Sequence, residues 1–420
     1  MIFLICLAAF MVSGDIFFVI PIGGFTLRIF QIVMCPVLLK GLWDLLNRSI
    51  WPVGFGYLLL WTLFILCFVP NTSFLDRNIF YALWLIFSVL MVLGMTSCID
   101  THEKLQTVLR WYVYSYGFSA AFGLSQFILP LIGLHPFLVQ QWWFPGILAR
   151  INGFTYEPSY YATYMIAGWV MIDYLRYKKF GLPYLDLVYW LVTVALLLSS
   201  SRIGWATMIA WLGLRAFWHL RKRSFPWCKL AIAGMVTASI LIAATLWLGL
   251  RTEDLSFLTS GLGILEEMGS YSSQGRWDTT MQTLRVYADH PIIGVSLGGI
   301  APEIARQNEI SVADNEDAKT NEGLCTTAEV LAASGTIGFV FYVLYMSKLC
   351  GTVLPSRKGT VLAVALGWGL IFQLIILQTD QNILRGYVWF HIALLSAAFG
   401  VARTSPELST YDPSYASSIS

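Results

Sequence analysis

The chain has 420 residues, of which 57% are hydrophobic and only 12% are charged. A chain with this composition and a mean hydropathy of +0.68 is not a water-soluble globular protein, so we expect a protein that crosses a membrane several times. The net charge is only +2 and no soluble segment carries a basic stripe with interleaved aromatic residues, which argues against nucleic acid as a partner.

Runs of about 20 apolar residues, enough to cross a hydrocarbon core of roughly 30 Å, recur along the chain. We therefore expect an all-α integral membrane protein with about twelve transmembrane helices. Nine helices would lie in residues 1–250 and three in residues 325–402, with a large loop at 251–324 and a cytoplasmic tail at 403–420. The predicted spans lie near residues 1–20, 28–46, 53–69, 79–98, 107–131, 158–175, 184–199, 203–219, 229–250, 325–347, 359–378 and 386–402.

The first of these runs is interpreted as a retained span. It lacks a basic n-region, contains Asp15 and has no small-residue cleavage pattern at its end, so a cleaved signal peptide is not predicted. The seven cysteines are scattered along the chain, which predicts neither a disulfide framework nor a CxxC metal pair. No metal site is expected.

The basic residues predict how the spans are oriented. Lys and Arg are enriched in cytoplasmic loops, so the loops that carry the larger set are assigned to the cytoplasm, and both termini then lie inside. The larger set is Lys40, Arg48, Lys104, Arg110, Arg176, Lys178, Lys179, Arg215, Arg221, Lys222, Arg223, Lys229, Lys348, Arg357, Lys358 and Arg403. The outer set contains nine Arg and one Lys, namely Arg28, Arg77, Arg150, Arg202, Arg251, Arg276, Arg285, Arg306, Lys319 and Arg385. This preference for Arg suggests an outer surface that binds phosphate.

A serine-rich turn surrounds Arg202, between two apolar runs that leave almost no loop. Ser200 and Ser201 supply hydroxyl donors to this turn, and Gly204 lets another group approach closely. Two interpretations remain open, a phosphate-binding Arg and an interfacial Arg that marks a helix boundary.

The loop at 251–324 is too long and too apolar to be a simple connection. An apolar pattern at helical spacing after Gly275 predicts an amphipathic helix that stops near Pro291 and covers the end of the bundle. Arg276 would open this helix, where free backbone N–H groups favour an anion. Arg285 lies nine positions later and would point to the opposite face, so only one of the two can reach a shared site.

Four segments of the chain stand out as possible family signatures: ARINGFTYEPSYYATY, SSSRIGW, GRWDTTMQTLRVYADHPIIGVSLGG and TNEGLCTTAEVLAASGTIGF, with the large outer loop between the ninth and tenth spans. Together they resemble the signature blocks of the O-antigen ligase and polymerase superfamily. The resemblance implies a GT-C-like membrane glycosyltransferase in the bacterial inner membrane. It would act at the periplasmic face on glycans carried by undecaprenyl pyrophosphate, without a metal ion, a nucleotide sugar or another cofactor.

The resemblance also assigns residues and an activity. The family's arginines correspond to Arg202 and Arg276, which are the predicted catalytic residues. Ligases that transfer glycan to lipid A core usually have His before the Asn of the fourth block, and this chain has Thr320 before Asn321. A polymerase of glycan repeat units is therefore favoured, with an O-antigen ligase or a protein O-oligosaccharyltransferase as alternatives. Its expected partners are the lipid-linked glycan, membrane lipid and, as a candidate, a regulator of chain length.

Catalysis would combine positioning with electrostatic stabilisation of a departing pyrophosphate, for which the planar guanidinium of Arg is suited. Glu157, before Pro158 at the start of a span, is the predicted base that aligns the acceptor hydroxyl. His290 and Glu322 are further candidates for that task, although the His-Pro context of His290 is also typical of a helix end. The predicted substrate-binding residues are Arg150, Ser200, Ser201, Asn321, Glu322, Arg285 and His290. For His391 and His135 we expect an ordinary buried imidazole with its hydrogen bonds satisfied.

A flippase or another transporter of lipid-linked oligosaccharide is the alternative from a different class. Such a protein also has many spans and basic groups, but the inverted repeats expected of many transporters are not visible in this sequence.

Overall fold

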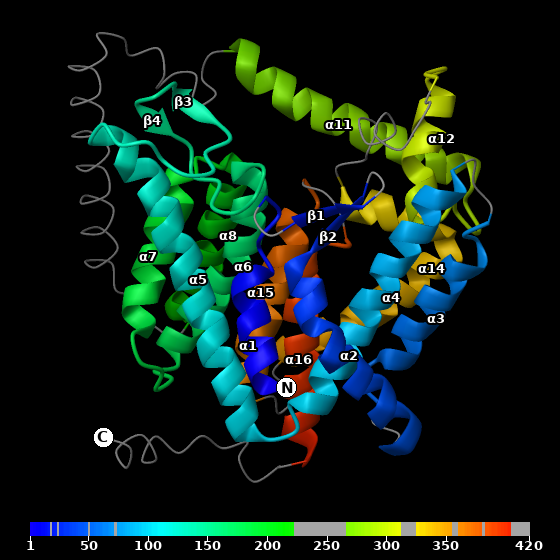
Figure 1. The fold of residues 1–420 in the computed structure, drawn as a ribbon, viewed down its shortest axis with the longest axis horizontal. Helices are drawn as coiled ribbons and strands as arrows, with labels where there is room; N and C mark the ends of the chain where they lie inside the picture. The colour runs from blue at the N-terminus through cyan, green and yellow to red at the C-terminus, as the bar shows by residue number, and fades with distance from the viewer. Residues whose placement is uncertain are drawn as a thin grey trace.

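The computed structural model describes residues 1–16, 19–22, 25–48, 51–70, 74–221, 266–311, 325–354, 360–379 and 383–404. Within these ranges the protein is mostly helical, and its helices form a bundle (Figure 1). A helix occupies eleven of the twelve predicted span positions; the ninth span, near 229–250, lies outside the described residues. The bundle helices are α1 (Ile2–Met11), α2 (Ile29–Arg48), α3 (Phe55–Cys67), α4 (Leu75–Cys98), α5 (His102–Leu131), α6 (Pro158–Tyr177), α7 (Leu185–Leu198), α8 (Arg202–Arg221), α14 (Thr326–Cys350), α15 (Val361–Ile376) and α16 (Gly386–Thr404).

Several of these helices have the length and composition to cross a membrane. Four candidate spans are found in the described residues, at Ile29–Asn47, Leu75–Cys98, Thr326–Val353 and Gly386–Arg403, and α1, α3, α7 and α15 are shorter apolar helices. The protein is therefore a helical membrane protein. The total of twelve spans, the domain limits and the orientation stay predictions.

The first predicted span, over residues 1–20, is wrong in its length. Helix α1 ends at Met11, and β1 (Val19–Ile22) pairs with β2 (Phe25–Arg28) in an antiparallel hairpin with Val19 opposite Arg28. Pro21 offers no backbone N–H to a helix, and the β-branched residues Val19 and Ile20 favour an extended chain. Within the described residues the fold is thus all-α except for this hairpin and a second one, β3 (Trp142–Phe144) with β4 (Leu148–Ala149).

Both hairpins, α11 (Glu266–Asp289) and α12 (Ile300–Gln307) lie together at one end of the bundle, which we call the site end (Figure 1). Helix α11 crosses this end and packs against α14. The amphipathic helix predicted after Gly275 is present, and it ends before Pro291 as expected.

A break in α14 fastens the chain that follows α11 to the bundle. Gly335 has a left-handed backbone (φ +56), and a Cβ there would lie 2.3 Å from the carbonyl oxygen of Ile292. The backbone N–H groups of Val295 and Ser296 donate to the carbonyls of Ala332 and Ala333, at 2.9 and 2.8 Å. The segment after α11 is therefore held by hydrogen bonds to two carbonyls that the break in α14 leaves without a donor from their own helix.

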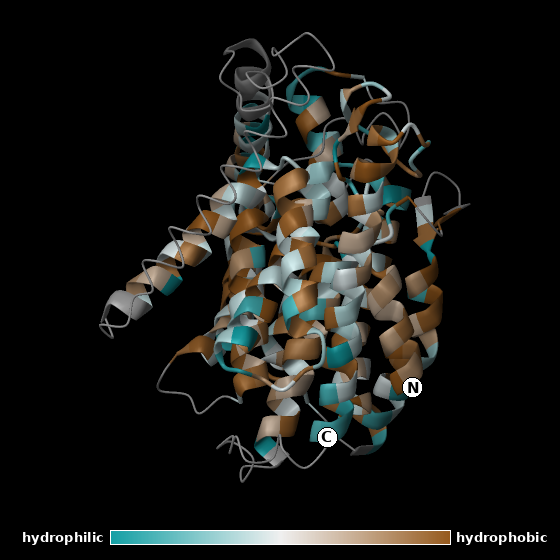
Figure 2. Cartoon of the chain, turned by 90° about the vertical axis from the view of Figure 1, so that its left-hand side faces the viewer, coloured by the Kyte–Doolittle hydropathy of each residue, from teal (hydrophilic) through white to brown (hydrophobic). Residues whose placement is uncertain are grey.

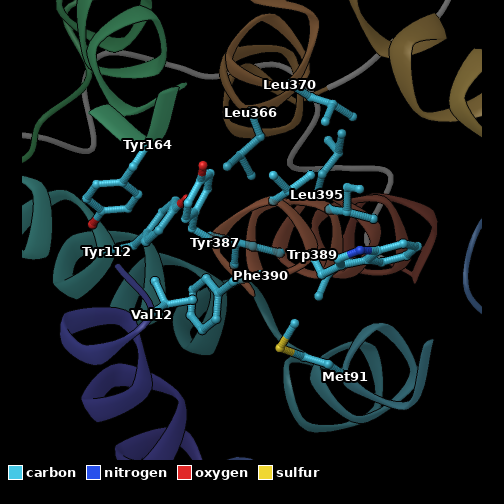
Figure 3. Packing of buried hydrophobic residues seen from close by; sticks show 14 of the residues in the cluster. Val12, Met91, Tyr112, Tyr164, Leu366, Leu370, Tyr387, Trp389, Phe390 and Leu395 are labelled. Carbon is cyan, nitrogen blue, oxygen red and sulfur yellow. The ribbon is translucent and has the colours of Figure 1, made fainter. Parts of the chain in front are cut away.

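Helices α15 and α16 form the centre of the bundle, where α16 packs against α4 and α15, and α15 packs against α6. Large side chains of α16 such as Trp389 and Phe390 are fully buried, and Figure 3 shows them among residues of α4, α5 and α15. His391 is also fully buried, with Nε2 2.8 Å from the carbonyl of Leu366 and Nδ1 3.1 Å from the Tyr112 hydroxyl. This confirms the expected satisfied imidazole for His391, whereas His135 is exposed, so the same expectation is wrong there.

The outward faces of the peripheral helices are apolar. Leu39, Trp43 and Leu46 of α2 are 68%, 66% and 74% exposed, and Leu187 and Trp190 of α7 are 57% and 55% exposed. Figure 2 shows hydrophobic residues along the helices, with hydrophilic residues gathered toward the two ends of the bundle. Such faces would be unfavourable in water but are suited to contact with lipid acyl chains.

Candidate functional site

Arg150 connects two separate segments at the site end. It directly follows β4, and its backbone N–H donates to the carbonyl of Gln141 at 3.0 Å. Its guanidinium donates from Nη1 to Gln141 Oε1 at 2.8 Å and from Nη2 to the carbonyl oxygen of Ser200 at 3.4 Å. The β3–β4 hairpin and the serine turn are thus held together by one side chain. Its Nε is buried and forms no hydrogen bond with described residues.

The serine turn itself orients Arg202. Ser200 has a left-handed backbone (φ +57), and the Ser201 hydroxyl accepts a 3.4 Å hydrogen bond from the backbone N–H of Gly204. Ser201 therefore caps α8, and Arg202 is the first residue of that helix, where its exposed guanidinium is free of hydrogen bonds and ion pairs to described residues. A Cβ at Gly204 would lie 3.0 Å from the Ala162 Cβ, so glycine permits α8 to approach α6 closely.

Arg276 lies within α11 and is half-buried. Its Nη1 donates to the carbonyl oxygen of Thr379 at 3.2 Å. The expectation that Arg276 opens its helix is wrong, because α11 begins at Glu266. The free N–H groups of a helix N-terminus are therefore ten residues away, and Arg276 can attract an anion only through its own guanidinium.

The segment that receives Arg276 is fixed to α14. The backbone N–H of Thr326 donates to the carbonyl of Leu377 at 3.1 Å, and the backbone N–H of Ile383 donates to Glu329 Oε2 at 3.0 Å. The carbonyl that Arg276 contacts, that of Thr379, therefore lies between two residues, Leu377 and Ile383, that are hydrogen-bonded to α14.

Glu157 is the N-cap residue of α6, and Pro158 is the first residue of that helix, as expected from the sequence. Its carboxylate accepts a 3.1 Å hydrogen bond at Oε2 from the Ser159 hydroxyl, and its carbonyl accepts one of 2.8 Å from the Thr155 hydroxyl. The second carboxylate oxygen accepts no hydrogen bond from the described residues, and the side chain is half-buried. A carboxylate in this arrangement can still accept a proton or a hydroxyl hydrogen bond.

The loop before Glu157 is stiffened by a buried amide network. Asn152 is fully buried and donates to the carbonyls of Leu138 and Thr155, at 3.0 and 2.7 Å. Gln126 of α5 accepts from the backbone N–H of Gly153 at 2.8 Å and donates to its carbonyl at 3.0 Å. These contacts order the residues between Arg150 and Glu157.

The electrostatic environment of Arg150 shows which charged groups are near one another. Burial lowers the pKa of Arg150, the Glu157 carboxylate raises it, and the positive charges of Arg202 and Arg276 lower it further. All three groups must therefore lie within electrostatic reach of Arg150. The structure brings Arg150, Arg202, Arg276 and Glu157 together at the site end, from three separate segments of the chain: the loop between β4 and α6, the start of α8, and α11.

A second charged cluster at this end was not predicted. Asp15 forms ion pairs of 2.9 Å with Arg28 of β2 and with Arg385, and all three groups are largely buried. Arg385 also lies 4.1 Å from the ring centroid of Tyr160 in α6, and the backbone of Asp15 donates to the carbonyl of Phe154. The cluster thus supports the loop that ends at Glu157. The signal in the sequence was a carboxylate in an apolar run, which requires a charged partner.

Arg285 and His290 make no contact with Arg150, Arg202 or Arg276 in the described part of the chain. Arg285 is exposed and has no hydrogen bond or ion pair within the described part of the chain, whereas Arg276 contacts the bundle, so the two differ in their surroundings as their spacing predicts. His290 Nε2 lies 3.5 Å from Glu303 Oε1 of α12, and Gln307 donates to Asp289 at 2.8 Å. His290 therefore helps to join α11 to α12.

Asn321 and Glu322, like Thr320, lie outside the described residues. In the ranges that are described, no group of three or more His, Cys, Asp and Glu side chains is arranged to hold a metal ion.

Comparison with known proteins identifies the central part of the chain. Residues 187–343 match a family model described as O-Antigen ligase. The resemblance to the O-antigen ligase and polymerase superfamily is confirmed. The match spans less than half of the chain and contains Arg202 and Arg276. Members of the family are glycosyltransferase-like enzymes that act on lipid-linked glycans. A search of curated proteins finds no match to the chain.

Proposed function

We propose that the protein is a polymerase of undecaprenyl-pyrophosphate-linked oligosaccharide repeat units in the bacterial inner membrane. The observation that carries this proposal is the convergence of Arg150, Arg202 and Arg276 with one carboxylate, Glu157, at the site end. Three guanidinium groups beside one carboxylate leave an excess of positive charge, which suits a diphosphate. The family match supports a lipid-linked glycan as the substrate.

The proposed reaction is one group transfer. The bond between the anomeric carbon and the pyrophosphate oxygen breaks, and the electron pair leaves with undecaprenyl pyrophosphate. A hydroxyl oxygen of the acceptor sugar forms the new glycosidic bond, and its proton passes to the Glu157 carboxylate. Arg202 and Arg276 stabilise the charge on the departing pyrophosphate, and this stabilisation needs no metal ion.

Arg150 has a supporting role in this proposal. Two of its nitrogens are engaged by Gln141 and Ser200, which leaves it less free than Arg202 to bind substrate. It would set the distance between the serine turn and the Glu157 loop, while its charge adds to the field at the phosphate.

A polymerase is favoured over a ligase because Thr320 stands where the lipid A core ligases usually carry His. An O-antigen ligase and a protein O-oligosaccharyltransferase are the alternatives from the same superfamily, and a lipid-linked oligosaccharide flippase is the alternative from another class. If the protein is a polymerase, a ligase or a protein transferase, the site end faces the periplasm and both termini lie in the cytoplasm. A chain-length regulator would be a further partner of the polymerase.

The test is the length of the surface glycan in cells that carry single substitutions. Arg202→Ala, Arg202→Lys, Arg276→Ala and Arg276→Lys should each abolish long glycan, because an ammonium group cannot bind phosphate bidentately. Loss of one such donor costs a factor of about 10² to 10³ in rate in enzymes that stabilise an oxyanion. The matched control is Arg285→Ala, which removes an exposed Arg from the same helix as Arg276 and should leave the glycan long.

The lipid-linked glycans of a deletion strain distinguish the alternatives. A polymerase deletion should export single repeats, a ligase deletion should accumulate long lipid-linked glycan, and a flippase deletion should retain repeats on the inner leaflet. Loss of glycosylated protein with normal surface glycan would indicate the protein transferase. Normal chain lengths in well-inserted Arg202 and Arg276 variants would overturn the proposed site.

A further inference from the structure

A pocket of about 390 Å³ lies where α6 is followed by α7, at the opposite end of α6 from Glu157. Helix α6 has 20 residues and so separates this pocket from the site by about 30 Å. Its volume falls at the lower end of the range of pockets that bind small ligands, about 300–1,000 Å³. Its lining includes Arg176, Lys179, Phe180, Leu182, Tyr184 and Asp186.

The charged groups around this pocket are mostly cationic. Arg176 forms an ion pair with Asp186 and lies 3.9 Å from the ring centroid of Tyr189, so its charge is already balanced. Lys179 is exposed, and its side-chain ammonium forms no hydrogen bond or ion pair with the described residues. Lys178 lies over aromatic rings but is not paired with a carboxylate in the described part of the chain. The turn therefore carries two cations in excess of its carboxylate.

The backbone at Lys179 is unusual for a lysine. Its φ of +52 is left-handed, and the N–H groups of Lys179 and Phe180 donate to the carbonyls of Arg176 and Leu175, at 2.9 and 3.0 Å. This is the hydrogen-bond pattern of a helix end at which glycine is the preferred residue. The chain thus holds a cationic side chain at a position where glycine would be less strained. Such an outlier points to a functional role for the side chain.

An apolar face begins beside the pocket and runs along α7. Leu187, Trp190 and Val194 are spaced by three and four residues, so they share one side of this helix. They are 57%, 55% and 41% exposed. A cationic pocket therefore adjoins an apolar strip at the end of a membrane helix, which is the arrangement that matches an amphiphile with an anionic head.

We propose that this pocket binds the phosphate head group of an anionic phospholipid, with Lys179 as its cation and the acyl chains along the exposed face of α7. Basic pockets between membrane helices on the cytoplasmic side are typical sites for anionic head groups. Zwitterionic lipids gain less from the excess of positive charge. The proposal does not depend on the glycan chemistry at the site end.

The experiment is a titration of the purified full-length protein in a neutral detergent with phosphatidylglycerol, with bound lipid counted by native mass spectrometry. Phosphatidylglycerol should bind more tightly than phosphatidylcholine. Lys179→Gly should weaken the binding of phosphatidylglycerol about fivefold, which is the effect of removing one lysine near an anionic lipid surface. It should not lower the melting temperature, because glycine fits the left-handed backbone. Lys179→Arg should retain the lipid.

Lys104→Gln is the matched control, since Lys104 is a partly exposed lysine in the first turn of α5 that pairs with Asp100 and lies outside the pocket. It should leave lipid binding unchanged. Equal binding of phosphatidylglycerol and phosphatidylcholine would overturn the proposal, and so would equal loss in the Lys104 and Lys179 variants. Glycerol phosphate binding as tightly as the lipid would also overturn it, because the acyl chains would then contribute nothing.

Discussion

The Arg150 guanidinium donates a hydrogen bond of 3.4 Å to the backbone carbonyl oxygen of Ser200, which lies fifty residues further along the chain. Ser200 is the left-handed residue of the turn that places Arg202 at the start of α8. The same guanidinium is held by Gln141, next to β3. One side chain therefore links the position of Arg202 to the hairpin and to the loop that ends at Glu157.

We expect Arg150→Lys to reduce glycan polymerisation although it keeps the positive charge. One lysine ammonium cannot reproduce a planar fork that reaches Gln141 and Ser200 from two nitrogens. The measurement is the chain length of surface glycan at matched protein levels. Arg306→Lys is the control, because Arg306 is exposed and, among the described residues, pairs with Glu303 of its own helix, where water screens the ion pair. Long glycan in Arg150→Lys would show that charge alone suffices.

Apolar runs predicted the helices well, because a membrane helix needs a continuous stretch of apolar residues. The helix after Gly275 was predicted to end near Pro291, and it does. The predicted start of this helix was wrong. The polar residues from Glu266 onward show no apolar pattern at helical spacing, yet they belong to α11. Both hairpins were missed since strands of two to four residues leave too short a pattern.

The site could be predicted only in part. Arg202 and Arg276 were singled out by local sequence, but the sequence does not show that Arg150 and Glu157 lie near them. The pairing of Asp15 with Arg385 joins residues 370 positions apart, so only the folded chain reveals it. The partner of Arg276, the carbonyl of Thr379, is a backbone atom and carries no sequence signal at all.

Gly153→Ala should destabilise the protein and impair polymerisation. Gly153 has a φ of +56, and a Cβ there would lie 2.6 Å from the Tyr161 ring, which is fully buried. We expect a loss of about 1–3 kcal/mol for the strained backbone, with the clash in addition. Thermal unfolding in detergent measures it.

The control for this prediction is Gly133→Ala. Gly133 also has a positive φ, +80, but a Cβ there would have no atom within 4 Å. Gly133→Ala is destabilised only by the strained backbone and not by a clash, so its melting temperature should fall less than that of Gly153→Ala. Equal melting temperatures would mean that Tyr161 moves without cost.

Asp15→Asn should lower the amount of folded protein more than any change at an exposed carboxylate. It leaves Arg28 and Arg385 without their shared counter-charge in a largely buried position. Removing one partner of a buried ion pair typically costs about 3–5 kcal/mol. Asp100→Asn, which breaks the exposed pair with Lys104, should cost less than about 1 kcal/mol. Similar protein levels and melting temperatures for the two variants would argue against a buried cluster.

The contact between α11 and α12 should weaken in acid. The hydrogen bond from Arg306 lowers the pKa of Glu303 below its usual value, and the contact with His290 of the α11 end lowers it further, while burial opposes both. A carboxyl whose pKa is lowered on folding stabilises the protein above its unfolded pKa, and this contribution is lost as the pH falls through the folded pKa. The contribution of Glu303 to the protection of the α12 backbone should therefore decrease as the pH falls below about 4.3.

Hydrogen exchange of the α12 amides, corrected for the intrinsic effect of pH, measures this protection. Glu303→Gln should remove the acid-dependent step, because the amide does not titrate and the ion pairs to His290 and Arg306 are already lost. Glu309→Gln is the control: Glu309 is exposed and has no ion pair among the described residues, so its variant should keep the step. If the step persists in Glu303→Gln, a different group controls the docking of α12, and His290 is then not held through Glu303.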